Sequence, residues 1–70
     1  MPIAIAPSGQ KMKILKILTD EKTKKHLENL GLTVNSDITV LSKSGGSVIC
    51  LVNEGRLALD SGLVTKIFVS

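Results

Sequence analysis

The sequence predicts a mostly-β fold: a small, partly open barrel of short strands with one short α-helix inserted. The chain has 70 residues, of which 43% are hydrophobic, which is enough for one core and too few for two. Short runs rich in β-branched residues alternate with tight turns that contain Gly or Asn, and only one segment has helical spacing. We therefore expect a single domain over residues 1–70.

The first main strand is expected to follow a turn at Pro7–Gly9. Polar and apolar residues alternate in Lys11–Ile14, as in a strand with one buried face. The alternation breaks at Leu15 and resumes in the opposite phase in Lys16–Leu18. A bulge at this break would keep the apolar residues of both parts on the inner side of the sheet.

One short helix is predicted to start after Thr19-Asp20, whose side-chain oxygens suit an N-cap. It ends at Gly31, because glycine readily takes the left-handed conformation at C′. Leu32 then lies where a Schellman cap packs it back on Leu27, so we assign Gly31, Leu27 and Leu32 a structural role. The buried stripe of this helix is predicted to consist of Thr23, Leu27 and Leu30.

Four further strands are predicted, and tight turns separate them. The strands are Ile38–Leu41, Val48–Val52, Arg56–Leu59 and Lys66–Val69, and the turns are Ser44–Ser47, Asn53–Gly55 and Asp60–Gly62. Val48–Val52 is apolar at every position, a pattern that implies cover on both faces. The core covers one face, and the helix, the apolar N-terminal segment or another protein must cover the other.

The residues that carry enzymatic or metal chemistry are sparse. No nucleophile–base set and no phosphate-binding loop occurs, so we expect a binding domain and not an enzyme. Cys50 is the only cysteine and His26 the only histidine, which excludes an internal disulfide and a closed Cys/His zinc site. Cys50 is predicted to be a small buried apolar residue, and His26 to face solvent. We expect no resident cofactor, and weak binding of ferrous iron or another transition metal stays open.

The composition also limits the kind of partner. Phe68 is the only aromatic residue, so the chain lacks the rings on which single-stranded nucleic acids stack and those that line proline-rich peptide grooves. No segment approaches the ~20 apolar residues of a membrane helix, and no secretory signal is recognisable, so direct membrane insertion is not expected. A single free thiol and the missing export signal predict a cytoplasmic location.

A protein-binding surface is the remaining hypothesis. Leu41, Ile49 and Leu51 are predicted to leave aliphatic surface exposed on neighbouring strands, beside the basic helix face of Lys24 and Lys25. An apolar patch rimmed by charge is a common form of interaction site. The same patch could drive self-association, so a homo-oligomer is an open alternative.

The order of the elements and their turn residues resembles the ferrous-iron transport protein A (FeoA) family over nearly the whole chain. The matching segments are Pro7–Ile14, His26–Asn35, Gly45–Ile49, Gly55–Leu59 and Lys66–Val69. Within them, Asn35 stands where the family usually has glycine. The resemblance implies an SH3-like barrel and a small cytosolic accessory protein of ferrous-iron transport. It also implies a partner, the FeoB-type membrane protein, which combines a cytosolic GTPase domain with a permease.

Two other functions remain open. The chain could be a stand-alone regulatory barrel like the C-terminal domain of metal-dependent repressors, although it carries no DNA-binding helical region. A metal chaperone is the third possibility, and the single His and single Cys disfavour it.

Overall fold

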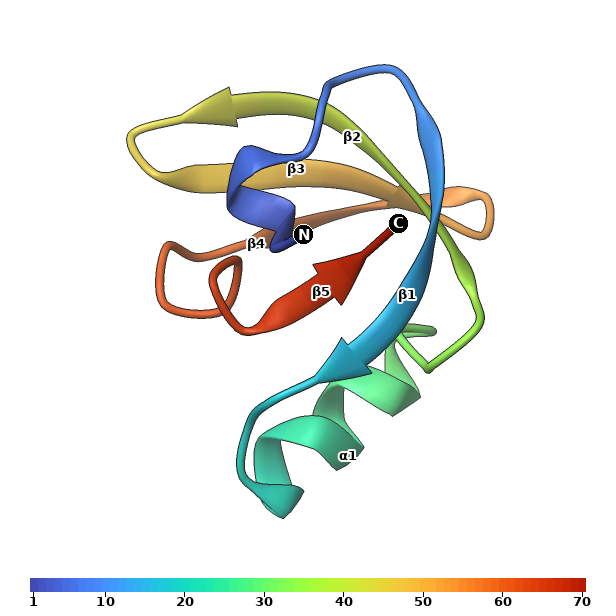
Figure 1. Cartoon of the computed structure of the whole chain (residues 1–70). Helices are drawn as coiled ribbons and strands as arrows, with labels where there is room; N and C mark the ends of the chain where they lie inside the picture. Colours follow the sequence, from blue (N-terminus) through green and yellow to red (C-terminus); the bar gives the residue numbers. More distant parts are fainter.

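The computed structural model, which describes residues 1–70, contains five antiparallel strands in one open sheet with the order β4-β3-β2-β1-β5 (Figure 1). Together with the short helix, this confirms the mostly-β fold class predicted from the sequence. The elements are η1 (Ile3–Ile5), β1 (Lys11–Ile17), α1 (Glu21–Asn29), β2 (Asp37–Ser44), β3 (Ser47–Val52), β4 (Gly55–Leu59) and β5 (Ile67–Val69).

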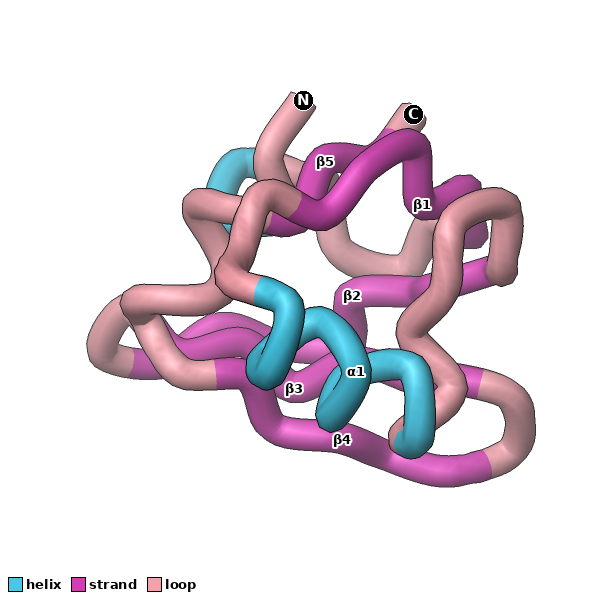
Figure 2. The backbone as a smooth tube through the Cα atoms, turned by 90° about the horizontal axis from the view of Figure 1, so that it is seen from below, coloured by secondary structure: helices cyan, strands magenta, loops and turns pink.

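The sheet curls strongly, and its two edge strands, β4 and β5, do not pair with each other (Figures 1 and 2). The apolar core fills the inner side and contains no polar or charged side chain. Helix α1 contributes one buried residue to this core, Leu27. The C-terminal end of α1 meets the β3–β4 hairpin, where Gly31 lies against Val52 and Asn53.

Strand β1 contains the predicted bulge. Its pairing with β5 shifts register between Ile14 and Lys16, so Leu15 is the extra residue and points outward, half exposed. The shift brings Ile17 to the inner side with Ile14, and both side chains are buried. The break in alternation at Leu15 therefore marks a β-bulge, as predicted.

Both ends of α1 have the predicted caps. The Asp20 carboxylate accepts a hydrogen bond from the Thr23 amide at 3.3 Å. At the other end, the Leu32 amide donates to the Leu27 carbonyl at 2.9 Å and the Gly31 amide to the Glu28 carbonyl at 3.0 Å, which is the Schellman pattern. Gly31 has a φ of +95°, and the side chains of Leu27 and Leu32 are buried together in the core.

The predicted buried stripe on the helix is only partly right. Leu27 is buried, Thr23 is half-buried, and Leu30 is 41% exposed. Leu30 is the C-cap, so the chain leaves the helix there, and Leu32 takes the inward place beyond it. Leu32, at position C″ of the cap, thus makes the apolar contact with the core that Leu30 would make if the helix continued.

The β2–β3 hairpin turns at Ser44–Ser47, as predicted. Ser44 pairs with Ser47, which leaves a two-residue loop, Gly45–Gly46, with φ values of 57° and 86°. Positive φ at both positions defines a type I′ turn, whose twist matches that of the flanking strands. The strands therefore extend to the glycines and include both serines.

The N-terminal segment closes one edge of the sheet. The Met1 amino group donates to the Val69 carbonyl at 2.8 Å, and the Val69 amide donates back to the Met1 carbonyl at 2.7 Å. Ile3 and Ala6 are fully buried in the core. Two apolar side chains of this segment thus complete the inner side of the fold, whereas Ile5 is 68% exposed.

Candidate interaction surface

The centre of the candidate surface is the outer face of β2 and β3. In β3, Val48, Cys50 and Val52 point into the core, and Ile49 and Leu51 alternate with them on the outer face. Ile49 and Leu51 each leave 36% of their surface exposed. Neither the helix nor the N-terminal segment provides the second layer of cover that the apolar run predicted.

A bulge in β2 adds the third apolar side chain. The register between β2 and β3 shifts between Val40 and Ser42, so Leu41 is the extra residue and points outward, 38% exposed. Thr39 pairs with Leu51 and Ser42 with Ile49, which places Leu41 beside both apolar residues of β3. Leu41, Ile49 and Leu51 thus form one group, which we call the apolar patch.

Basic side chains flank the apolar patch in a regular row. Lys11 pairs with Thr39, Thr39 with Leu51, and Leu51 with Arg56. Residues paired across antiparallel strands project from the same face of a sheet. The row therefore crosses β1, β2, β3 and β4 and has a basic residue at each end, with three strand spacings between their backbones, about 14 Å along the sheet. Ala58, which pairs with Ile49, extends the apolar area toward β4.

A hollow of about 470 Å³ adjoins the patch at the end of the row that carries Lys11. Leu51 lines both the hollow and the patch, so the two surfaces are continuous. The remaining lining is mostly polar and comes from Lys11, Asn35, Ser36, Asp37, Ile38, Thr39 and Asn53.

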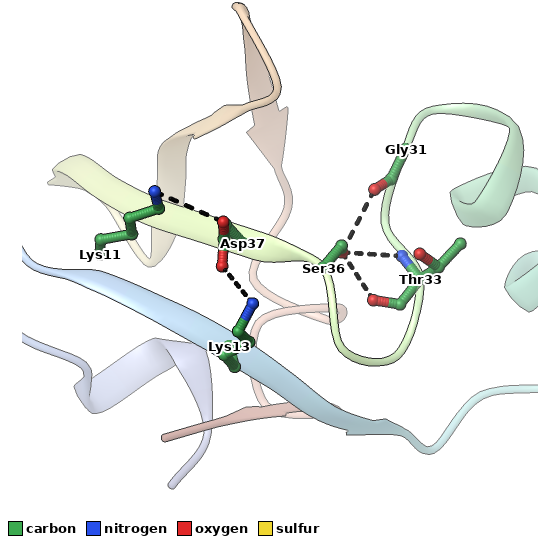
Figure 3. Close-up of polar contacts among 6 residues, drawn as sticks. All are labelled: Lys11, Lys13, Gly31, Thr33, Ser36 and Asp37. Carbon is green, nitrogen blue, oxygen red and sulfur yellow. Dashed lines mark hydrogen bonds and ion pairs between the residues drawn. The ribbon is translucent and has the colours of Figure 1, made fainter.

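Asp37 is the one acidic group of the hollow, and two lysines surround it (Figure 3). Its carboxylate lies 2.9 Å from Lys13 Nζ and 3.5 Å from Lys11 Nζ. The hydrogen bond from Lys13 is the main reason that the pKa of Asp37 lies below its usual value, and the charge of Lys11 adds to the effect. Asp37 is therefore ionised at neutral pH and paired most closely with Lys13, so Lys11 keeps a weaker attachment.

The loop before β2 forms one wall of the hollow and is held by backbone contacts. The Asn35 amide donates to the Ile14 carbonyl at 2.8 Å, and the Ile14 amide donates to the Ser36 carbonyl at 3.0 Å. The Ser36 hydroxyl lies 2.6 Å from the Thr33 carbonyl and accepts from the Thr33 amide at 3.2 Å (Figure 3). Asn35 has a φ of 74°, as its position in the turn suggested.

The five residues predicted to bind a partner are divided between the sheet and the helix. Leu41, Ile49 and Leu51 come together on the sheet, whereas Lys24 and Lys25 lie on α1. The basic residues that the strand register places beside the patch are Lys11 and Arg56, which were not among the residues predicted from the sequence. Their outward position follows from the alternation of each strand, but their common row depends on pairing between distant segments.

The other chemically distinctive residues lie apart from this surface. Cys50 is buried, as predicted, and its Sγ lies 3.4 Å from the Leu57 carbonyl. Burial raises the pKa of the thiol to about 11, so it is uncharged at neutral pH. His26 is exposed on α1, and no three His, Cys, Asp or Glu side chains converge in the structure. No helix is long and apolar enough to cross a membrane.

The sequence profile of the FeoA domain matches residues 1–70. The chain belongs to the FeoA family. That membership links it to ferrous-iron transport and places it in a family of small accessory domains, which is not a known enzyme family. A search of curated proteins gives no significant match.

Solved structures agree with the FeoA assignment. An iron uptake regulatory protein (FeoA) is 27% identical, with a TM-score of 0.88, and the alignment covers 99% of this chain and 93% of that one. A FeoA protein from Chlorobium tepidum has 17% identity and a TM-score of 0.88, over 99% of this chain and 68% of that one. ScaR with bound Zn²⁺ has 17% identity and a TM-score of 0.87, but this chain spans only 35% of it. The SH3-like fold of the FeoA domain is thus shared with part of a larger protein.

Proposed function

We propose that this FeoA-family chain is an accessory protein of ferrous-iron uptake that binds the cytosolic part of a FeoB-type membrane GTPase-permease. The observation that carries the proposal is the apolar patch of Leu41, Ile49 and Leu51, which no element of the chain covers. Burial of such a patch stabilises a complex, and the polar and charged residues around it suit the rim of an interface. In this function the iron is the cargo of the transporter, and the chain acts on the transport protein.

The affinity is expected to be moderate. Trp, Tyr and Arg dominate the energetics of most interfaces, and this face has only Arg56 among them. We expect a dissociation constant in the micromolar range, which suits an accessory protein that associates and dissociates with the state of the transporter.

Titration of isotope-labelled chain with the cytosolic GTPase domain of a FeoB-type transporter tests this proposal. We expect saturable chemical-shift changes at Leu41, Ile49 and Leu51. The variant Leu51→Asn should weaken binding at least about tenfold, because it removes an apolar contact at the centre of the face. The control Leu15→Asn changes a leucine that is 50% exposed, against 36% for Leu51, but lies on the β1 bulge, and it should bind like the parent chain. Equal loss of binding in both variants would contradict the assignment of the surface.

A stand-alone regulatory barrel is the second candidate function. It is supported by the structural similarity to ScaR and to a manganese-dependent transcriptional repressor, which has 17% identity, a TM-score of 0.87 and 40% coverage of that chain. Under this alternative, the chain binds the remaining part of such a repressor and not the transporter. Parallel titrations against a repressor that lacks its own SH3-like domain and against the transporter domain separate the two functions.

A further inference from the structure

The outer face of the sheet combines an apolar centre with an excess of positive charge. Lys11, Lys13, Lys16 and Arg56 give it four positive groups, against Asp37 on the face and Glu54 on the adjoining β3–β4 turn. Arg56 forms no ion pair within the chain, and Lys11 holds Asp37 only at 3.5 Å with its side chain 73% exposed. Both ends of the row that crosses Leu51 therefore carry a cation that is available to an incoming group.

We propose that this face recognises a protein segment in which apolar side chains are flanked on both sides by carboxylates. The inference rests on the proposed function in taking the apolar patch as the binding site, and it adds the chemistry of the bound segment. The apolar side chains cover Leu41, Ile49 and Leu51, and the carboxylates pair with Lys11 at one end and Arg56 at the other.

Lys11 lines the hollow, where it can bind a carboxylate of the partner even though Asp37 lies nearby. Asp37 is held more closely by Lys13, so Lys11 can turn toward a second carboxylate without leaving Asp37 unpaired. Asn35 and Asn53 line the same hollow, and their side-chain amides make no hydrogen bond within the chain. They supply neutral donors to an anionic group there.

Charge also argues against a second copy of the chain as the occupant. An isologous contact would place the same face on both partners, each with an excess of positive charge. Like charges in such a contact oppose association, whereas an acidic segment is attracted to the face. The face is therefore assigned to a different protein and not to a homodimer.

Three synthetic peptides test the inference without the transporter. They share a central pair of leucines and differ only at the flanking positions, which carry Glu, Gln or Lys. We expect the Glu peptide to shift the amide signals of Lys11, Leu51 and Arg56 saturably. The Gln peptide should bind about fivefold more weakly, because two exposed ion pairs are lost, and the Lys peptide should not bind. Added salt should remove the advantage of the Glu peptide.

A pair of charge-matched variants shows whether the row itself is responsible. The double variant Lys11→Gln/Arg56→Gln should bind the Glu and Gln peptides equally. The control Lys24→Gln/Lys25→Gln removes the same number of charges from α1 and should keep the fivefold difference. Loss of discrimination in the control instead would move the acidic contact to the helix and overturn the proposal.

The other possible outcomes of these titrations also test the proposal. No binding of the Glu peptide, or equal affinity for the Glu and Gln peptides, overturns the proposal. Signal changes at the same residues that depend only on the concentration of the chain would show a homodimer and overturn it too. If the transporter domain binds the patch but the peptides are not distinguished, this inference fails and the proposed function stands. If the peptides are distinguished but the transporter domain does not bind, the partner of the proposed function is wrong and the recognised chemistry stands.

Discussion

Gly31 faces the side chain of Asn53 so closely that a Cβ atom at Gly31 would lie 2.7 Å from Asn53 Nδ2 and 3.2 Å from Val52 Cγ1. The cap of α1 and the tip of the β3–β4 hairpin therefore meet at a position where an added Cβ would require the Asn53 side chain to move. Gly31 is required there for two separate reasons, its φ of +95° and this close approach.

We expect Gly31→Ala to lower the free energy of unfolding by about 1–2 kcal/mol or more. The cost of backbone strain at positive φ and the cost of the steric contact with Asn53 add together. Gly9→Ala is the matched control, since Gly9 has a φ of +82° and no atom within 4 Å of the added Cβ. Urea unfolding of both variants gives the comparison. Equal losses would show that the contact with Asn53 contributes nothing.

The two sides of the sheet should respond differently to truncation of leucine. Leu59 is 2% exposed, and Leu59→Ala should cost about 2–5 kcal/mol because it opens a cavity in the core. Leu51 is 36% exposed on the outer face, and Leu51→Ala should cost about 1 kcal/mol or less. Denaturation midpoints measure both effects. A loss at Leu51 as large as that at Leu59 would contradict its assignment to a binding surface.

Cys50 predicts a dependence of stability on alkaline pH. The pKa of its thiol is about 11 in the folded chain, against an ordinary value of 9.0, so the folded state holds the proton more tightly than the unfolded state. The resulting stability is complete below about pH 9 and is lost as the pH rises toward 11. Subtracting the stability curve of Cys50→Ala isolates this contribution from that of the lysines. A difference curve that stays flat over this interval would falsify the prediction.

Ferrous iron is expected to bind the isolated chain weakly, without a defined one-to-one site. A tight site needs several converging donors, and here His26 is exposed on α1 while Cys50 is buried as a thiol. Anaerobic calorimetry with the parent chain and with His26→Ala measures this. A tight stoichiometric site that His26→Ala abolishes would contradict the expectation.

Local features of the fold could be predicted from the sequence because neighbouring residues determine them. The Gly31 cap and the turn at Gly45–Gly46 depend on backbone conformations that few residues adopt. The bulge at Leu15 was visible because the apolar phase changes there. The bulge at Leu41 was not, because a single leucine followed by serine leaves the phase of the strand ambiguous.

The candidate site could be predicted only in part for a related reason. The apolar residues Ile49 and Leu51 stand out within one strand, but the row from Lys11 to Arg56 joins residues 45 positions apart through three strand pairings. A slip of one residue in any pairing would move one member to the other face. From the sequence alone, Lys24 and Lys25 stand out as a basic pair because they are adjacent, whereas the row from Lys11 to Arg56 exists only once the strand register is formed.

The reciprocal bonds between Met1 and Val69 have a consequence for chain connectivity. They hold the two ends of the described chain side by side, and both views of the backbone show the termini together (Figures 1 and 2). A short linker can therefore join Ser70 to Met1 without stretching the fold. If the circle is then cut between Gly45 and Gly46, every strand pairing is retained while β3 becomes the first strand of the chain and β2 the last. The arrangement of the sheet is thus separable from the order in which its strands are synthesised.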